Sequence, residues 1–478
     1  MTESEGLRRQ RALTAAGGRR DRAKDPIPAP PPQPEDGLAA PARYWAATAI
    51  WLAMAMATID STIANIALPT IARDVGATAD ASIWVVNAYQ VGITMVLLPV
   101  AMLGEIIGYR RVYMVGLGLF AAASAGCVLA HGLAGLAAFR FLQGLGAACV
   151  MAINGALLRL TYPKAALGQG IGYSVLVVAI TSAAGPSVAA AILAVASWRW
   201  LFAINIPIGL LSLAIGHCFL PPPRGTGARF DVRAAVLNAL AFGALFLASS
   251  DVAHGTASPR TALEALVGAA ASALLIRRSL GQKTPLVPLD LMRIPILRLS
   301  YATSACSFAA MIIAGVSLPF ILQERFGFSR VQTGLLMTPL PLGIAVASIA
   351  GGRLPARLHA GLIGGIGLGT LGLGLLLLTA QASAAPVFFI PALTLCGVGF
   401  GLFQTPNNRT MLSQAPHERS GAAGGMLATS RLVGQMAGAL LVALLFRMVG
   451  PAETAPLMLA AGLAFIAAAV SFTRITAR

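Results

Sequence analysis

The sequence predicts an all-α polytopic membrane protein, and three observations carry that prediction. Of the 478 residues, 57% are hydrophobic and 11% are charged, with a mean hydropathy of +0.78, whereas soluble chains are about half apolar and about a quarter charged. Apolar runs of the roughly 20 residues needed to cross a bilayer recur along the whole chain. These runs lack the short alternation of barrel strands, so we expect helices.

A window of about 19 residues indicates fourteen spans. Residues 1–42 precede them, mix both charge signs and contain a proline run, so they are expected to be a disordered cytoplasmic tail. The expected spans are 43–68, 81–103, 111–131, 133–158, 167–194, 199–220, 232–252, 260–277, 298–322, 331–352, 360–380, 386–410, 421–446 and 454–473.

Basic residues set the predicted topology. The formal net charge is +17, which in a soluble protein would suggest a nucleic-acid partner. Here the Lys and Arg residues gather in short loops, mainly those after even-numbered spans, so they indicate orientation in a lipid bilayer and no nucleic-acid partner. The positive-inside rule then places these loops and both termini in the cytoplasm, as in a multi-pass protein of the bacterial inner membrane.

Cofactor and enzyme chemistry find no support in the sequence. The five cysteines fall inside expected spans without paired or metal-like spacing, which favours a role as small packing residues. The phosphate-loop pattern G-x-x-x-x-G-K-[ST] does not occur, so ATP-driven transport is disfavoured. We expect no cofactor, no metal site and no enzymatic activity.

An internal similarity favours duplicated halves. The segment "AMLGEIIGYRR" (101–111) follows the second span, and "GRLPARLHAG" (352–361) follows the tenth. Both begin with a small residue and carry Arg close to a short turn. If the seventh and eighth spans are an insertion, the two loops occupy equivalent places in two six-helix halves, an arrangement common in transporters.

One acid stands inside the first expected span. Asp60 lies in "MATIDSTIANIALP", where a charge costs about 2.5–3.5 kcal/mol. Arg140, in the fourth span, carries a similar cost. At 1.5 Å per residue, Asp60 is about 14 Å from the outer end of its span and Arg140 about 10 Å, so they lie within about one turn of each other. An acid that exchanges a proton beside a fixed cation is suited to coupling, and a structural pair that locks helices is the alternative.

Four stretches carry a family resemblance. They are "IDSTIANIALP" (59–69), "RFLQGLGAACVMAINGALL" (140–158), "GYSVLVVAITSAAGPSVAAAI" (172–192) with "WRWLFAINIPIG" (198–209), and "GVGFGLFQTPNNRTML" (397–412) with "GMLATSRLVGQMAGAL". At these residues the chain resembles the major facilitator superfamily, and more narrowly its fourteen-span drug/proton antiporters of the EmrB/QacA type. The resemblance runs from about Trp51 to the last span. The loop at 101–111 departs from the family pattern, because two of its basic positions are missing.

The resemblance implies a domain plan and site residues. Two six-helix bundles, 43–220 and 298–478, would flank two extra central spans with their linkers, 221–297. Asp60 and Arg140 would couple transport to protons. A cytoplasmic gate would comprise Glu105, Gly108, Arg110 and Arg111, and the antiporter motif would keep Gly172, Gly185 and Pro186. Polar residues that can face substrate are Asn65, Gln143, Asn154, Gln404, Asn407 and Arg431, although hydrogen bonds between helices explain such residues equally well.

The sequence thus predicts a proton-coupled antiporter that exports small hydrophobic compounds, in the manner of multidrug efflux. Deep acids are scarcer than deep cations, so the expected substrates are neutral, weakly anionic or at most monovalent cations. The resemblance also allows a periplasmic adaptor as a partner. Two alternatives stay open, a dedicated exporter of one metabolite and a membrane sensor of the same fold that has lost transport.

Overall fold

The structure is a computed structural model that describes residues 37–77, 79–82, 84–222, 225–256, 258–280, 282, 285–353, 359–381, 386–416, 419–450 and 453–475. Residues 1–36 of the predicted tail therefore lie outside the described residues, and α2 begins at Ala42. All regular elements in the described ranges are helical.

The helices follow one another along the chain with short connections. In chain order they are α2 (Ala42–Asp74), α3 (Ala79–Ser82), α4 (Trp84–Ile107), α5 (Tyr109–Leu129), α6 (Leu133–Thr161), α7 (Leu167–Val195), α8 (Arg199–Ala203), α9 (Asn205–Phe219), α10 (Val232–His254), α11 (Pro259–Leu280), α12 (Leu289–Met292), α13 (Pro295–Phe320), η1 (Ile321–Arg325), α14 (Arg330–Met337), α15 (Pro339–Arg353), α16 (Ala360–Thr379), α17 (Pro386–Ser413), α18 (Ser420–Val449) and α19 (Ala455–Thr473).

Membrane spans account for most of these helices. Within the described residues, 13 helical segments are long and apolar enough to cross a bilayer. The 29-residue α7 contributes a shorter apolar stretch, Leu167–Ser182, to that search. The all-helical membrane fold is as predicted, and the count of fourteen spans stays a prediction.

Prolines divide three of the expected spans. The span expected at 199–220 breaks at Ile204, between α8 and α9, and α9 begins two residues before Pro207. The one expected at 331–352 breaks before Pro339, and the one at 298–322 passes after Pro319 into the π-helical η1. Proline lacks the amide donor of a regular helical turn and clashes with the preceding turn, which is why these helices end or widen at such positions.

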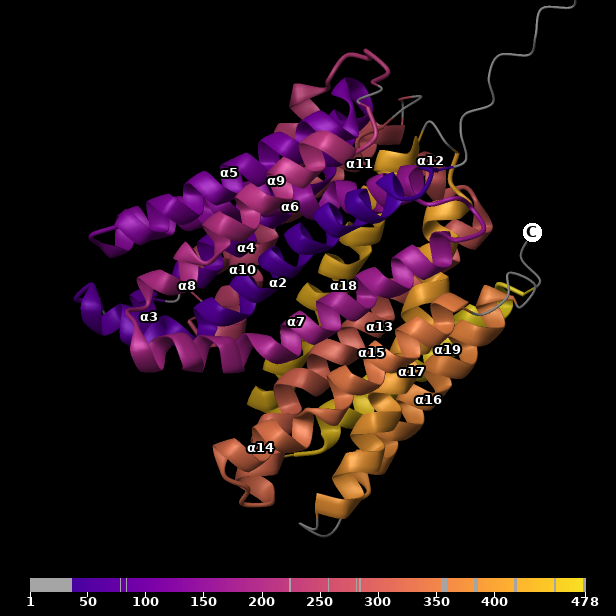
Figure 1. The fold of residues 1–478 in the computed structure, drawn as a ribbon. Helices are drawn as coiled ribbons and strands as arrows, with labels where there is room; N and C mark the ends of the chain where they lie inside the picture. The colour runs from indigo at the N-terminus through magenta and orange to yellow at the C-terminus, as the bar shows by residue number, and fades with distance from the viewer. Residues whose placement is uncertain are drawn as a thin grey trace, which may run out of the picture. The chain divides into compact units, whose positions relative to one another are not determined.

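The helices pack closely at one end of the described unit. Helices from the two halves of the sequence meet where α12 lies and splay toward α3 and α14 (Figure 1). At the α12 end, α18 packs on α4 and α6, and α7 packs on α15. The hairpin of α10 and α11 lies against α4 and α18.

Small residues permit the tight contacts at the α12 end. A Cβ at Gly352 on α15 would lie 2.7 Å from the carbonyl oxygen of Gly168 on α7. A Cβ at Gly421 on α18 would lie 2.7 Å from the carbonyl oxygen of Ala101 on α4. Within a bilayer, helix association depends on such close packing, because lipid is as apolar as the helices.

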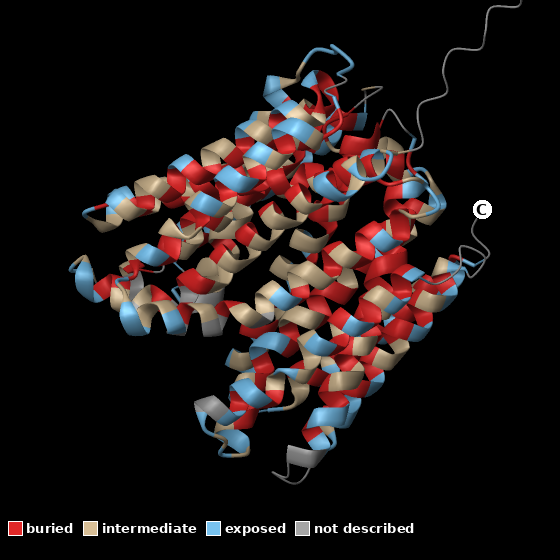
Figure 2. Cartoon of the chain, viewed as in Figure 1, coloured by how far each residue is buried: buried red, intermediate tan, exposed pale blue. Residues whose placement is uncertain are grey.

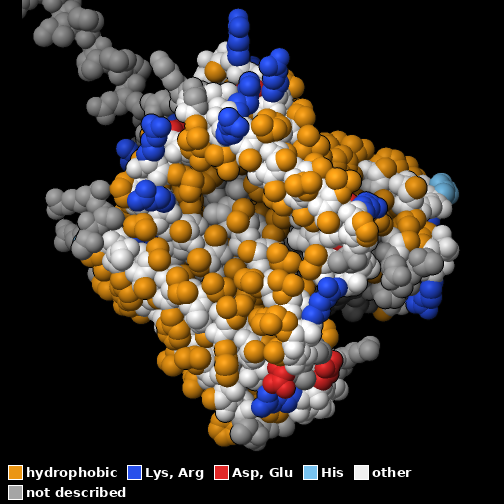
Figure 3. Space-filling model, turned by 180° about the vertical axis from the view of Figure 1, so that it is seen from behind, with side chains coloured by type: hydrophobic (Ala, Val, Ile, Leu, Met, Phe, Trp, Pro, Cys, Tyr) orange, Lys and Arg blue, Asp and Glu red, His pale blue; other side chains and the backbone are white. Residues whose placement is uncertain are grey.

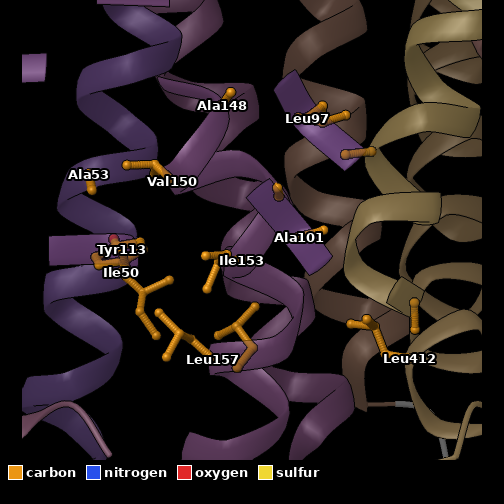
Figure 4. Packing of buried hydrophobic residues seen from close by; sticks show 14 of the residues in the cluster. Ile50, Ala53, Leu97, Ala101, Tyr113, Ala148, Val150, Ile153, Leu157 and Leu412 are labelled. Carbon is orange, nitrogen blue, oxygen red and sulfur yellow. The ribbon is translucent and has the colours of Figure 1, made fainter. Parts of the chain in front are cut away.

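Buried residues lie mainly on the parts of the helices that adjoin other helices (Figure 2). One core joins α2, α4, α5 and α6 with residues of α17 and α18. Ile50, Ile153 and Leu157 belong to it together with Leu412 of α17 (Figure 4). A second core joins α13, α16, α17 and α19. On the face that Figure 3 shows, the middle of the surface is mostly hydrophobic. Lys and Arg on this face gather mainly toward the α12 end.

Candidate functional site

Asp60 on α2 is buried and accepts hydrogen bonds from three side chains. Its Oδ2 accepts from Nη1 of Arg140 at 2.5 Å. Its Oδ1 accepts from Nε2 of Gln143 at 3.0 Å and from Nδ2 of Asn205 at 2.7 Å. Asp60 is 2% exposed and Arg140 0%. The structure therefore brings together the acid and the cation that the sequence analysis paired, within a network across α2, α6 and α9.

Arg140 is fixed from several sides. Its Nε donates to the carbonyl oxygen of Val85 at 2.9 Å. Its guanidinium lies over the ring of Tyr89, 4.3 Å from the centroid, and 5.4 Å from that of Phe202. Because a buried cation loses its hydration, these contacts and the ion pair with Asp60 replace water.

Gln143 takes part in the network from α6. Its Nε2 donates to Asp60 and to Oγ of Ser124 at 2.8 Å, and its Oε1 accepts from Nη1 of Arg140 at 2.6 Å. All of these partners are protein groups. In this conformation Gln143 therefore bonds between helices, one of the two roles that the sequence left open for it.

The sequence alone does not single out Asn205. It lies in "WRWLFAINIPIG" at the start of α9, directly after the break that follows α8. This break places a side chain from the sixth expected span against Asp60 of the first. The sequence feature that could have indicated Asn205 is its amide side chain inside an apolar span, two residues before a proline.

The Asp60 network keeps one negative and one positive charge out of water. Desolvating each ion costs several kcal/mol, which the ion pair and the surrounding donors offset. Nη2 of Arg140 and Oδ1 of Asn205 are buried and have no hydrogen-bond partner among the residues that the structure describes. The arrangement suits a carboxylate whose access to a proton requires the donors to move apart.

A second carboxylate–arginine pair joins Asp74, the last residue of α2, to Arg199 at the start of α8. Oδ2 of Asp74 accepts from Nε1 of Trp198 at 2.8 Å and from Nη1 of Arg199 at 3.0 Å. These hydrogen bonds lower the pKa of Asp74. The side chains of Asp74 and Arg199 are 47% and 35% exposed, so water screens this pair but not the Asp60 pair.

Glu105, at the end of α4, joins the two halves of the chain at the α12 end. Its Oε1 accepts from the backbone N–H of Ala422 at 2.6 Å, near the start of α18, where the helix dipole favours a carboxylate. Its Oε2 accepts from Nη1 of Arg419 at 3.0 Å. Arg419 also binds both carboxylate oxygens of Asp290 on α12, at 2.9 and 3.1 Å. The sequence alone indicates neither Arg419 nor Asp290 as a gate residue.

The other predicted gate residues do not touch this cluster in the structure. Arg110 donates to the carbonyl oxygens of Leu220, at 3.2 Å, and His217, which belong to α9 and its C-terminal end. Arg111 is exposed. Gly108 has φ +101° between α4 and α5, a conformation that favours glycine.

The antiporter-motif glycines bring α7 close to two neighbours. A Cβ at Gly172 would lie 2.9 Å from the carbonyl oxygen of Ser348 on α15. A Cβ at Gly185 would lie 2.1 Å from Oγ1 of Thr62 on α2. The side chain of Pro186 lies outside what the structure describes.

The remaining polar residues differ in their surroundings. Asn407 is buried; its Nδ2 donates to the carbonyl oxygen of Ser300 at 3.3 Å, and its Oδ1 accepts from Nη1 of Arg474 at 2.7 Å. Gln404 is buried. Asn154 is half-buried, and its Oδ1 has no hydrogen-bond partner in the described part of the chain. The side chain of Asn65 lies outside the described residues.

Arg431, near the middle of α18, is half-buried. Its guanidinium lies over the ring of Phe308, 4.9 Å from the centroid. Among the residues that the structure describes, no carboxylate forms an ion pair with it and no acceptor takes a hydrogen bond from it.

Comparison with known proteins identifies the family. Residues 50–439 match the model of the Major Facilitator Superfamily. The uncharacterized transporter YebQ of Escherichia coli is 49% identical over 445 residues, covering 92% of this chain and 97% of YebQ. The multidrug resistance protein Stp of Mycobacterium tuberculosis is 31% identical over 390 residues, covering 81% of this chain and 73% of Stp.

A solved structure shows the same fold. The human organic anion transporter MFSD10 (TETRAN) aligns with a TM-score of 0.61 at 16% identity, covering 90% of this chain and 99% of that one. At this identity the likeness concerns the fold, which is therefore the major facilitator fold predicted from the sequence. The chain is a multi-pass membrane transporter and belongs to the Major Facilitator Superfamily.

Proposed function

We propose that this transporter is a proton-coupled antiporter that exports small hydrophobic compounds across a bacterial cell membrane. The observation that carries the proposal is the Asp60 network, in which one carboxylate inside the spans is 2% exposed and held by Arg140, Gln143 and Asn205. A charge at this depth is expensive and marks a functional group by default. The multidrug resistance protein Stp, a relative at 31% identity, supports export of foreign compounds.

In the proposed cycle the α12 end faces the cytoplasm, with both termini on that side. The present conformation, closed at the α12 end by Glu105, Arg419 and the glycine contacts, would face outward. Asp60 would take up a proton when its donors move apart, which removes its attraction for Arg140. Return to the closed network would then require release of the proton to the other side.

The test uses purified protein in liposomes with an acidic interior and a panel of labelled neutral and monovalent hydrophobic dyes. The wild type should accumulate a dye from the panel only while the pH gradient lasts. Asp60→Asn should lose this accumulation, because the amide keeps size and polarity but cannot titrate. It should keep exchange of dye across the membrane without a gradient, which shows that the variant is folded.

The matched control is Asp74→Asn, which removes the carboxylate of the partly exposed Asp74–Arg199 pair. It should accumulate dye as the wild type does. Undiminished gradient-driven accumulation by Asp60→Asn would refute the coupling role, and wild-type uptake that ignores the gradient would refute proton coupling altogether.

A further inference from the structure

Arg431 lies where α18 leaves the closely packed end of the molecule. Of the eleven residues 420–430, ten are buried, whereas among 431–440 only Gly434 and Gly438 are. A Cβ at either of these two glycines would contact the backbone of α13, at Ala305 or Ala309. Beyond residue 430 the helix thus keeps its contact with α13, and its other faces become partly exposed.

Helix periodicity gives the direction in which Arg431 points. Gly424 lies seven residues, or about two turns, earlier on the same side of α18. That side faces α6, because a Cβ at Gly424 would lie 2.8 Å from the carbonyl oxygen of Ala152. Val433, 43% exposed, lies on the opposite side. Gly438, seven residues later on the same side, faces Ala309 of α13. Arg431 therefore projects between the α6 and α13 sides of α18, about 10 Å beyond Gly424.

The surroundings of Arg431 differ from those of two buried arginines, Arg140 within α6 and Arg419 at the start of α18. Arg140 has the carboxylate of Asp60, and Arg419 has those of Glu105 and Asp290. Arg431 has the ring of Phe308. Gln435 follows one turn later on the same side and is half-buried. In the described part of the chain, neither Arg431 nor Gln435 has a hydrogen-bond partner for its side chain.

We propose that Arg431, Gln435 and Phe308 form a substrate subsite for a carboxylate carried on an aromatic or apolar body. The planar guanidinium matches a carboxylate with two parallel hydrogen bonds, and the amide of Gln435 adds a donor. The ring of Phe308 stands edge-on to Phe400, with centroids 5.2 Å apart, and supplies an apolar wall beside the charge. The inference rests on the proposed export function and names the class of compound exported, amphipathic monoanions.

Arg431 is a cation within a span and has no anionic partner among the described residues. A guanidinium inside a span costs several kcal/mol unless a partner or water solvates it. Because Arg431 is half-buried, water screens its charge less than at a fully exposed position, so a bound carboxylate would gain more there than in a surface ion pair. A cationic ligand at the same place would be repelled.

Two matched probes test the subsite, 2-naphthoate and its neutral counterpart 2-naphthamide. Their binding is measured by equilibrium dialysis against the full chain in lipid nanodiscs at pH 7.5, without any gradient. The wild type should bind the naphthoate at least about tenfold more tightly than the amide, because ionic hydrogen bonds are about twice as strong as neutral ones. In Arg431→Gln the two affinities should agree within about twofold, with amide binding unchanged.

The control is Arg447→Gln, which removes an exposed arginine from the far end of the same helix and should keep the preference. If Arg431→Gln binds neither probe, the variant Gln435→Ala provides the test instead. It should weaken the binding of naphthoate by several-fold and leave the binding of naphthamide unchanged. Equal wild-type affinities, or a preference that survives Arg431→Gln, would overturn the proposal. Because no proton gradient is used, Asp60→Asn should keep the preference, so this proposal and the coupling proposal fail independently.

Discussion

A carboxylate inside a membrane span needs compensation, and Asp60 receives it from donors on two other helices. Arg140 supplies the opposite charge, and Gln143 and Asn205 occupy the second carboxylate oxygen. The pair is thus one part of a network whose members depend on one another. Removing one charge leaves the other buried and uncompensated, whereas removing both leaves a polar but neutral cluster.

This asymmetry predicts the stability of charge variants. Arg140→Gln should lower the free energy of unfolding by about 3–5 kcal/mol, because Asp60 stays buried without its cation. The double variant Asp60→Asn with Arg140→Gln should recover part of that loss. Thermal unfolding in detergent, followed by intrinsic fluorescence, measures both.

Arg199→Gln provides the matched control at the partly exposed pair and should change stability by about 0–1 kcal/mol. A double variant no more stable than Arg140→Gln would contradict the network account.

For single residues, the sequence identifies buried charges more readily than it identifies the residues that bind them. Asp60 and Arg140 stand out because a charge within an apolar run is rare, and their similar depths pair them. Asn205 and Arg419 do not stand out, since an amide near a proline and an arginine beside a span end are common. Their partners are 145 and 314 residues distant in the chain, a separation that no local pattern encodes.

At the level of helices, the length of each apolar run predicts where a helix lies, and the positions of the glycines determine how closely two helices pack. The expected spans agree with the helices to within a few residues at most ends, for example 133–158 against Leu133–Thr161. The internal breaks at Pro207, Pro319 and Pro339 are missed, because an average over about 19 residues conceals a single proline. The glycine contacts between α7 and α15 depend on tertiary packing and cannot be read from composition.

The contact at Gly172 leads to a prediction about conformation. Gly172→Ala should push α7 away from the carbonyl oxygen of Ser348, since its Cβ would lie 2.9 Å from that atom. Overpacking of this kind costs about 1–3 kcal/mol, enough to shift the balance between conformations by about tenfold. The population in which the α12 ends of α7 and α15 have separated should therefore increase.

Nitroxide labels at Ala165→Cys and His359→Cys, both exposed near that end, would report the change as longer distances by pulsed electron resonance. Gly118→Ala serves as the control, because nothing lies within 4 Å of a Cβ there. Identical distance distributions for Gly172→Ala and the wild type would count against α7–α15 packing as the closure of this end.

For the whole molecule, charge is distributed unevenly along the axis of the spans. Lys and Arg number 34 against 17 Asp and Glu, and on the face that Figure 3 shows, the basic side chains gather mainly toward the α12 end. Basic residues in short loops are retained on the cytoplasmic side during insertion. The family fixes the fold but not this orientation, so the orientation calls for a test of its own.

Labelling of two exposed positions on either side of α10 tests the orientation. Ala228 precedes α10 and Thr256 follows it, and both are exposed. In a background without the five native cysteines, Thr256→Cys should react with an impermeant maleimide added to intact spheroplasts. Ala228→Cys should stay unlabelled, because the basic loop is predicted to lie inside. Both variants should react after lysis, which controls for the accessibility of each cysteine.

The reverse pattern would place the α12 end outside. Equal labelling of both positions in intact spheroplasts would mean that α10 does not cross the membrane, and would remove the seventh span from the predicted count.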